Sequence, residues 1–313
     1  MLEDVSCPLG CPKRDDVVLI GCDLLHDLPG NFTVVKCQTC GLMRTNPRPS
    51  PDAIGPYYPD NYGPYLGTRV ENPKSNSSGW IKKILRPVVR WVFNFNTTPL
   101  PTTLTGRMLE IGCASGAFLH HMACQGWSVQ GIEYSERAAQ AATKLGYMVH
   151  CGPLETAPQP DEPFDLIVGW MVLEHLHNPV GGLKKLREWA KRDAWLILSV
   201  PNAGSLEFRL FKDKWYALQL PTHLYHFTPH TLKEVLTASG WNLEEVYHQR
   251  VLSNLIASLG YALRSKGFTQ IGQRLISFPE RAGKWNYVLY PLAWLLSMFG
   301  QTGRMVVWAK VKS

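Results

Sequence analysis

Short apolar runs typical of strands alternate with amphipathic helical patterns between residues 105 and 250. The strand-like runs are apolar along most of their length, as in "RMLEIG", "FDLIVGWMVL" and "AWLILSVPN". Strands of this kind are buried on both faces, and helices that alternate with them form the crossovers of a parallel sheet. The pattern therefore predicts an α/β fold, to which "RMVVWAKVK" near the end of the sequence adds a closing strand.

The expected elements follow from this periodicity and from helix-capping residues. Ser135 and Thr228 stand where two helical patterns begin, and their hydroxyls can accept hydrogen bonds from the first turn. We expect helices at 116–126, 136–146, 179–192 and 228–240. Strands are expected at 107–112, 128–135, 147–152, 164–173, 194–202, 241–250 and 304–312.

The first expected strand ends in "LEIGCASG", where an acid, Glu110, precedes a glycine-rich turn and a helix. Glycines in such a turn let the backbone approach a ligand closely. A dinucleotide site needs G-x-G-x-x-G, but the corresponding residues here are Gly112, Ala114 and Ala117. Glu110 would also repel a pyrophosphate, so the turn favours a cationic ligand without phosphate, such as S-adenosylmethionine.

A second acid, Glu133, ends the second expected strand, where a carboxylate can accept hydrogen bonds from both hydroxyls of a ribose. Together with "GIEYS", "FDLIVGWMVLEHLHNP" and "LILSVPN", the turn "LEIGCASGAFL" resembles class I S-adenosylmethionine-dependent methyltransferases, in particular the group of the ubiquinone-biosynthesis O-methyltransferases. The resemblance covers about 105–250. It implies a Rossmann-like sheet of strand order 3-2-1-4-5-7-6, with "RMVVWAKVK" as the antiparallel last strand.

The resemblance also implies which residues hold S-adenosylmethionine. The methionine end of the cofactor would lie against the glycine-rich turn, and the ribose would bind the acid that ends the second strand. The adenine would lie beside a tyrosine and a Leu-Glu pair, and the sulfonium would face the end of the fourth strand. These cofactor-binding candidates are Glu110, Gly112, Ala114, Gly116, Glu133, Tyr134, Leu154, Glu155, Trp170 and Met171.

Methyl transfer to oxygen or carbon needs a base, and histidine suits this role near neutral pH. His223 and His226 lie in "LPTHLYHFTPHT", a loop after the fifth strand that should cover the sheet edge where ligands bind. His175 follows the fourth strand at the same edge. We expect His223 to be the catalytic base, with His226 as the second candidate. For His175, a structural role beside the cofactor is favoured over catalysis.

Five of the eight cysteines lie in the first forty residues of a sequence in which we find no secretory signal. Cys7 and Cys11 form one pair and Cys37 and Cys40 a second pair, separated by strand-like runs, as in a zinc ribbon. We expect these four cysteines to bind one structural Zn²⁺, with Cys22 as an alternative to Cys7 or Cys11. "CQTCGLMRTNPRP" with "YYPDNYGPY" resembles a ribbon-bearing methyltransferase subset associated with glycan, sugar or secondary-metabolite pathways.

The sequence divides into a ribbon at 1–50, a Tyr- and Pro-rich connector at 51–104, and a methyltransferase domain at 105–313. In the connector, the basic amphipathic run at 80–95 is either a docking helix with a solvated basic face or a helix on an anionic membrane. A helical insert is expected at 252–303. Its apolar run "YVLYPLAWLLSMFG" is too short to span a bilayer, and it either packs in the core or dips into lipid.

Composition leaves the acceptor open. The net charge of +7 fits an anionic partner without identifying one. We expect a cytoplasmic enzyme, with the membrane surface as an alternative location, that methylates a sugar, glycan or lipid-linked small molecule. One alternative is a zinc-ribbon RNA methyltransferase, although nucleic acid is not an expected partner because acids offset the basic residues of the ribbon. Another alternative is a non-catalytic binding module with the same fold.

Overall fold

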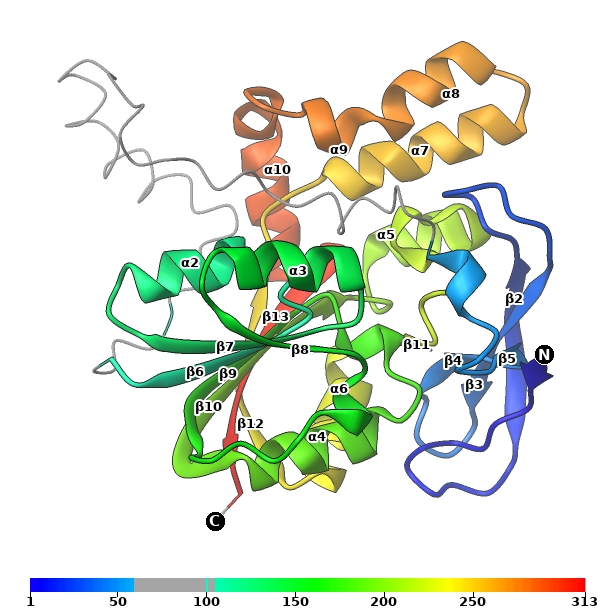
Figure 1. The fold of residues 1–313 in the computed structure, drawn as a ribbon. Coiled ribbons are helices and arrows are strands. Elements are labelled where there is room, and N and C mark those ends of the chain that lie inside the picture. The colour runs from blue at the N-terminus through cyan, green and yellow to red at the C-terminus, as the bar shows by residue number, and fades with distance from the viewer. Residues whose placement is uncertain (59–99, 101–104, 313) are drawn as a thin grey trace, which may run out of the picture.

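The computed structural model describes residues 1–58, 100 and 105–312. A seven-stranded sheet forms its centre, with the strand order β12-β13-β10-β9-β6-β7-β8 (Figure 1). Most of the expected connector, including the expected helix at 80–95, lies outside the described residues. The strands of the sheet are β6 (Arg107–Ile111), β7 (Ser128–Glu133), β8 (Met148–Cys151), β9 (Phe164–Trp170), β10 (Ala190–Pro201), β12 (Trp241–His248) and β13 (Arg304–Val311).

The pairing of these strands confirms the expected topology. β6 pairs in parallel with β7 on one side and with β9 on the other, and β8 and β10 continue the parallel sheet outward. The last strand, β13, runs antiparallel between β10 and β12, with Val307 opposite Leu198. Numbered along the chain, the seven strands have the order 3-2-1-4-5-7-6, which is the Rossmann-like order that the resemblance implied.

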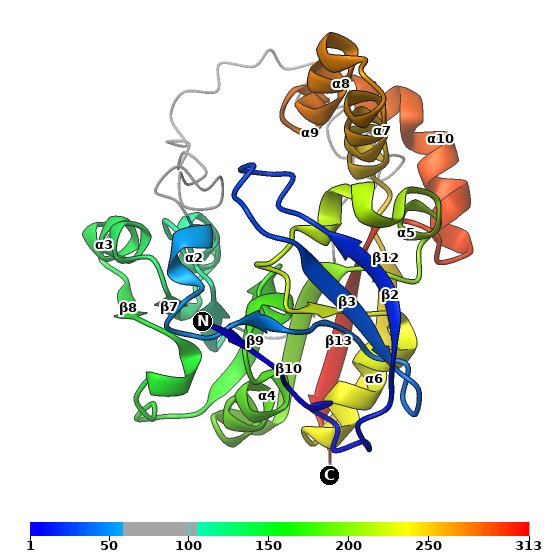
Figure 2. The same cartoon turned by 90° about the vertical axis from the view of Figure 1, so that its right-hand side faces the viewer.

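Helices cover both faces of the sheet (Figures 1 and 2). Successive side chains of a strand point to opposite faces, so Met108 packs into the core on one face and Leu109 into the core on the other. This two-sided burial explains why the strand sequences are apolar throughout. The covering helices are α2 (Ala117–Ala123) and α3 (Glu136–Lys144) on one face, and α4 (Pro179–Glu188) and α6 (Pro229–Ala238) on the other.

Both expected helix caps are present. The Ser135 hydroxyl accepts a hydrogen bond from the backbone N–H of Ala138 at 3.4 Å. The Thr228 hydroxyl accepts one from the N–H of Thr231 at 3.2 Å, and the Thr231 hydroxyl in turn accepts one from the N–H of Thr228. Side-chain oxygens therefore satisfy backbone donors that the helix itself leaves without a partner.

Several expected boundaries are wrong by a few residues; the strand expected at 164–173, for example, ends at Trp170. The helix expected to run to residue 192 ends at Glu188, and β10 begins at Ala190. Ala190 pairs with Phe164 of β9. Trp189, which lies between the end of α4 and the start of β10, is buried. Pairing with the neighbouring strand therefore places these residues in the sheet, although their own periodicity continues the helix.

The N-terminal segment forms a small antiparallel sheet that includes a strand of the main domain. Strand β11 pairs with β4, with Tyr225 opposite Arg44, and gives the order β11-β4-β3-β2. The ribbon therefore lies against the loop that follows β10 (Figure 2). Its strands are β2 (Asp15–Gly21), β3 (Phe32–Cys37), β4 (Met43–Thr45) and β11 (Tyr225–His226), and β1 (Leu2–Glu3) pairs separately with β5 (Arg48–Pro49).

The expected insert between β12 and β13 is helical and projects from one end of the molecule (Figure 1). Among the described residues, no helix combines the length and the apolar character that a membrane span requires. The helices of the insert are α7 (Ser253–Ser265), α8 (Thr269–Ile276), α9 (Phe278–Arg281) and α10 (Trp285–Met298), and a short helix, α5 (Leu206–Phe211), precedes them after β10.

Candidate active site

The glycine-rich turn after β6 lies directly against the segment that follows β9. Gly112 has a φ of +67°, and a Cβ at this position would lie 2.4 Å from Cγ2 of Val172. Gly116, with a φ of +81°, precedes the first residue of α2. Glycine is therefore required at Gly112 both for the left-handed backbone and for the close approach of the two segments. The turn brings the carboxyl ends of β6 and β9 together.

Glu133, at the end of β7, fixes this turn. Its Oε2 accepts a hydrogen bond from the N–H of Ala114 and its Oε1 accepts one from the N–H of Ser135, both at 2.8 Å. Ala114 has a φ of +46°, which is unusual for a residue other than glycine, and the bond to Glu133 holds it there. Burial raises the pKa of Glu133, although these backbone donors act in the opposite direction. Each oxygen keeps a second lone pair for a ligand hydroxyl.

Glu110 lies at the end of β6 and is 3% exposed. Its Oε2 is buried and has no hydrogen-bond partner. Burial, followed by the charge of Glu133, raises the pKa of Glu110 to about 8. A buried carboxylate oxygen without a donor is costly unless a ligand supplies one. The unpaired carboxylate oxygen of Glu110 can accept a hydrogen bond from the ammonium group of a cationic ligand, which is the kind of ligand expected from the sequence.

Two more candidates lie at the end of β9, next to the turn. The ring of Trp170 packs edge-to-face on Phe118 of α2, with 5.3 Å between the ring centroids, and its Nε1 is buried without a partner. Met171 has a φ of +58°, and its Sδ accepts a hydrogen bond from the Ser199 hydroxyl at 3.9 Å. Both residues therefore lie at the carboxyl end of β9, beside the glycine-rich turn, and their contact with a sulfonium stays a prediction.

The candidates for adenine contact are spread more widely. Tyr134 is 53% exposed, and its ring centroid lies 6.4 Å from that of Tyr58. The Leu154 side chain is buried in the core shared with α4, and Glu155 is exposed. Tyr134 directly follows Glu133, which is hydrogen-bonded to the turn. In contrast, the Leu154 side chain is buried in the core and Glu155 is exposed to solvent.

His175 and His223 form an edge-to-face pair with 4.7 Å between the ring centroids. Nδ1 of His175 lies 3.0 Å from the carbonyl oxygen of Thr222, and Nδ1 of His223 lies 2.9 Å from that of Ala217. Because a carbonyl can only accept, each Nδ1 carries the proton and each Nε2 keeps its lone pair. His175 is half-buried and also contacts the Tyr58 hydroxyl at 2.9 Å, whereas His223 is fully enclosed.

Burial keeps both histidines neutral. It lowers the pKa of His175 to about 4, against the opposing effect of the hydrogen bond to Thr222. Burial, together with the neighbouring His175 and His226, holds the pKa of His223 well below its usual value. His226 lies on β11, where its Nε2 is 3.3 Å from the Thr45 hydroxyl, and burial lowers its pKa to about 3. His226 thus contacts the ribbon, although it is close enough to His223 to lower the pKa of that side chain.

Glu174 was not singled out from the sequence, although it adjoins His175 in "LEH". It is fully buried and neither carboxylate oxygen has a hydrogen-bond partner. One oxygen of Glu174 and one ring nitrogen from each of His175 and His223 lie within 4.8 Å of one another. Burial raises the pKa of Glu174 to about 8. These three polar side chains are therefore grouped at the carboxyl edge of the sheet, beside the candidate cofactor site.

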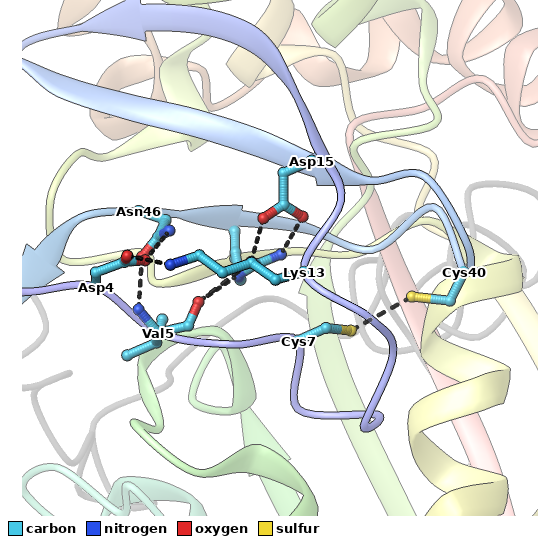
Figure 3. Close-up of polar contacts among 8 residues, drawn as sticks. Asp4, Val5, Cys7, Lys13, Asp15, Cys40 and Asn46 are labelled. Atoms are coloured by element: carbon cyan, nitrogen blue, oxygen red, sulfur yellow. Dashed lines mark hydrogen bonds and ion pairs between the residues drawn. The ribbon is translucent and has the colours of Figure 1, made fainter.

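The four expected cysteines of the ribbon are brought together. One Sγ from each of Cys7, Cys11, Cys37 and Cys40 lies within 4.8 Å of the others, and the Sγ atoms of Cys7 and Cys40 are 3.6 Å apart (Figure 3). Cys22 is not a member of this cluster, so the alternative ligand set does not form. None of these four cysteines forms a disulfide.

A buried arginine that the sequence did not identify supports the cysteine loops. The Arg44 guanidinium donates two hydrogen bonds to Asp15, at 2.9 and 2.6 Å, and another to the carbonyl of Val5 at 3.1 Å. Lys13, Asp4 and Asn46 form a second polar group beside it (Figure 3). Arg44 therefore links the N-terminal segment at Val5 to Asp15 of β2.

Comparison with known proteins identifies a family. The family described as "Methyltransferase domain" matches residues 84–246, just over half of the chain. A ubiquinone biosynthesis O-methyltransferase of Nitrosospira multiformis is 27% identical over 153 residues, which are 44% of this chain and 64% of the relative. The enzyme of the same name from Maricaulis maris is 27% identical over 151 residues, covering 44% and 59%. The chain thus spans less than two thirds of these relatives.

Among solved structures, the S-adenosylmethionine-dependent methyltransferase of Mesorhizobium loti aligns with 72% of this chain and 97% of its own, at 16% identity and a TM-score of 0.45.

Proposed function

The chain belongs to the family of S-adenosylmethionine-dependent methyltransferase domains, and on this premise we propose that it methylates an oxygen or carbon atom of a small molecule, a sugar, glycan or lipid-linked intermediate. The observation that carries the proposal is the buried, unpaired carboxylate oxygen of Glu110 at the glycine-rich turn. The relatives are, by their names, O-methyltransferases of ubiquinone biosynthesis, which supports an oxygen atom of a small molecule as the acceptor.

The bound cofactor supplies an electrophilic methyl group on a sulfonium. Three side chains would hold it: Glu110 would bind the ammonium group, Glu133 would accept hydrogen bonds from the ribose, and Met171 would face the sulfonium. By holding the cofactor in one orientation, these residues would let the acceptor atom approach the methyl group in line.

The acceptor proton goes to a neutral imidazole in this proposal. His175 Nε2 is the better placed acceptor, because His175 is half-buried whereas His223 is fully enclosed behind it. His223, which the sequence favoured as the base, then orients His175 through the ring contact. The ionised form of Glu174 would stabilise the imidazolium that forms, since one of its oxygens lies in the same cluster.

The four-cysteine cluster holds a structural Zn²⁺ in this proposal. Four thiolates within 4.8 Å of one another are a complete tetrahedral donor set, which leaves no open position for chemistry. The ion would replace the need for a larger apolar core in this small sheet.

The proposal is tested first by calorimetry with S-adenosylmethionine. We expect binding by the wild-type chain and at least tenfold weaker binding by Glu110→Gln. Glu234→Gln is the matched control, because Glu234 is exposed on α6, outside the candidate cofactor site, and its loss should change little. Incubation with hydroxyl-bearing sugars, glycans and polyprenyl-linked acceptors, followed by mass spectrometry, should then reveal the gain of one methylene. If the wild-type chain does not bind the cofactor, the proposed function is wrong and the chain is a binding module.

A further inference from the structure

Helix α10 exposes a broad apolar face. Six of its exposed side chains, each between 44% and 69% exposed, define what we call the α10 face: Trp285, Val288, Leu292, Trp294, Leu295 and the adjoining Phe299. On the opposite side of the helix, Tyr290 and Ala293 are buried against the protein. Soluble monomers rarely expose so many large apolar side chains together. The α10 face therefore needs a partner.

The geometry of the helix shows how wide this face is. At 3.6 residues per turn, the six residues cover about half of the helix circumference. A coiled-coil seam is narrower, because it uses only two of every seven positions. In addition, none of the fourteen residues of α10 is charged. A half-cylinder of apolar side chains without any charge resembles a helix that lies in a lipid interface more than one that packs on a single helix.

The charged residues of the helical insert are mostly positive. Between residues 253 and 299 the chain carries five cations and one acid. Lys284 stands directly before α10 and Arg281 lies three residues earlier, and both are exposed. The single acid is Glu280. Cations at the end of an apolar helix complement a surface of anionic lipid headgroups. In a symmetric contact between two copies, the same cations would face one another with only Glu280 to pair with.

We propose that the α10 face docks in the headgroup region of an anionic membrane, with α10 parallel to the surface. The tryptophans lie at the boundary between acyl chains and headgroups, where their amphipathic rings are favoured. Arg281 and Lys284 contact the lipid phosphates. This arrangement does not require a membrane-spanning helix, and none is found among the described residues. The surface is separate from the cofactor site, so the proposal does not depend on methyl transfer.

The insert connects the α10 face to the histidine pair. The hydroxyl of Ser258 in α7 accepts a hydrogen bond from the N–H of Tyr216 at 2.9 Å. The next residue, Ala217, provides the carbonyl that holds Nδ1 of His223. Docking of the insert would therefore place the acceptor side of the candidate site close to the membrane, where a lipid-linked molecule is found.

The test is co-sedimentation of the full chain with vesicles of phosphatidylcholine alone and with vesicles that contain phosphatidylglycerol as well. We expect strong binding only to the anionic vesicles. The double variant Trp285→Ser/Leu292→Ser should lower the partition coefficient at least tenfold, and Arg281→Glu/Lys284→Glu should abolish the preference for anionic lipid. Met148→Ser is the control, because Met148 is 69% exposed on β8, far from the insert in the sequence.

Binding of S-adenosylmethionine by each variant shows whether it is folded. The proposal is overturned if the wild-type chain ignores anionic vesicles, or if the double variant binds them as well as the wild type does. It is also overturned if the wild type is a stable dimer in solution that the double variant splits into monomers, because the α10 face would then be an interface between copies. Replacing residues 80–95 by a Gly/Ser linker should leave most vesicle binding intact. Complete loss would assign lipid binding to that segment instead.

Discussion

At the scale of single residues, the buried Glu110 should make the binding of a cationic ligand depend on pH. Its pKa is raised to about 8 in the ligand-free protein, so the side chain is mostly protonated near pH 6.5. A cationic ligand binds the ionised form, and each pH unit below the pKa weakens binding up to about tenfold. We therefore expect the affinity for S-adenosylmethionine to rise between pH 5.5 and 7.5, as measured by calorimetry. Glu110→Gln should bind weakly at every pH. An equally steep rise in that variant would assign the titration to another group.

Gly112 tests the close approach of the two strand ends. In Gly112→Ala, the new Cβ would lie 2.4 Å from Val172 in a backbone with a φ of +67°. We expect a loss of about 2–4 kcal/mol in the free energy of unfolding, measured with urea, and loss of cofactor binding.

Gly146→Ala is the matched control for this variant. Its φ is +93°, but no atom lies within 4 Å of the added Cβ. It should lose only about 1–2 kcal/mol from the left-handed backbone and keep its cofactor affinity. Equal effects of the two substitutions would show that the contact with Val172 is unimportant.

The two histidines should differ in their kinetics. If His175 receives the acceptor proton, His175→Ala should lower kcat by about 100- to 10,000-fold and leave the dissociation constant of S-adenosylmethionine unchanged. His223→Ala should lower kcat less, because His223 acts by orienting His175. The measurement is single-turnover methyl transfer to the acceptor found by mass spectrometry. A larger loss in His223→Ala would restore His223 as the base.

At the scale of elements, local sequence signals can be checked separately from tertiary packing. The Thr228 cap bonds reciprocally with Thr231 at the start of α6. Thr228→Ala should therefore lower the free energy of unfolding by about 1 kcal/mol. Thr237→Ala, at an exposed position of the same helix, should change it by less than half as much. Urea unfolding measures both. Equal losses would mean that the hydroxyl of Thr228 contributes nothing as a cap.

Local sequence signals of this kind also determine which parts of the fold and of the candidate site could be predicted from the sequence. The presence and order of the strands, the caps and the turn at Gly112 are encoded within a few residues each, so they could be predicted. The end of α4 depends on Ala190 pairing with Phe164, and such a long-range contact leaves no local pattern. Glu174 was missed for a similar reason. An acid beside a histidine is ordinary in sequence, and only the fold reveals that His223 is brought to both of them.

At the scale of the whole molecule, the ribbon and the main domain share one sheet. Strand β4 pairs with β11, and the Thr45 hydroxyl donates a hydrogen bond to the carbonyl of His223 at 2.8 Å. The cysteine cluster closes the loops on either side of these strands. Disorder in the ribbon would therefore disturb the histidine pair directly. The glycine-rich turn should be affected less, because it lies at the ends of β6, β7 and β9.

This arrangement predicts that loss of the metal separates cofactor binding from turnover. Cys40→Ser should lower the zinc content measured by plasma mass spectrometry and reduce kcat at least tenfold. The dissociation constant of S-adenosylmethionine should stay within about twofold of the wild-type value, since β6, β7 and β9, which carry the turn, do not pair with the ribbon strands among the described residues. Cys22→Ser is the control, because Cys22 lies outside the cluster. If Cys40→Ser keeps full turnover without zinc, the ribbon does not support the acceptor side. If it loses cofactor affinity as well, the two parts of the molecule unfold together.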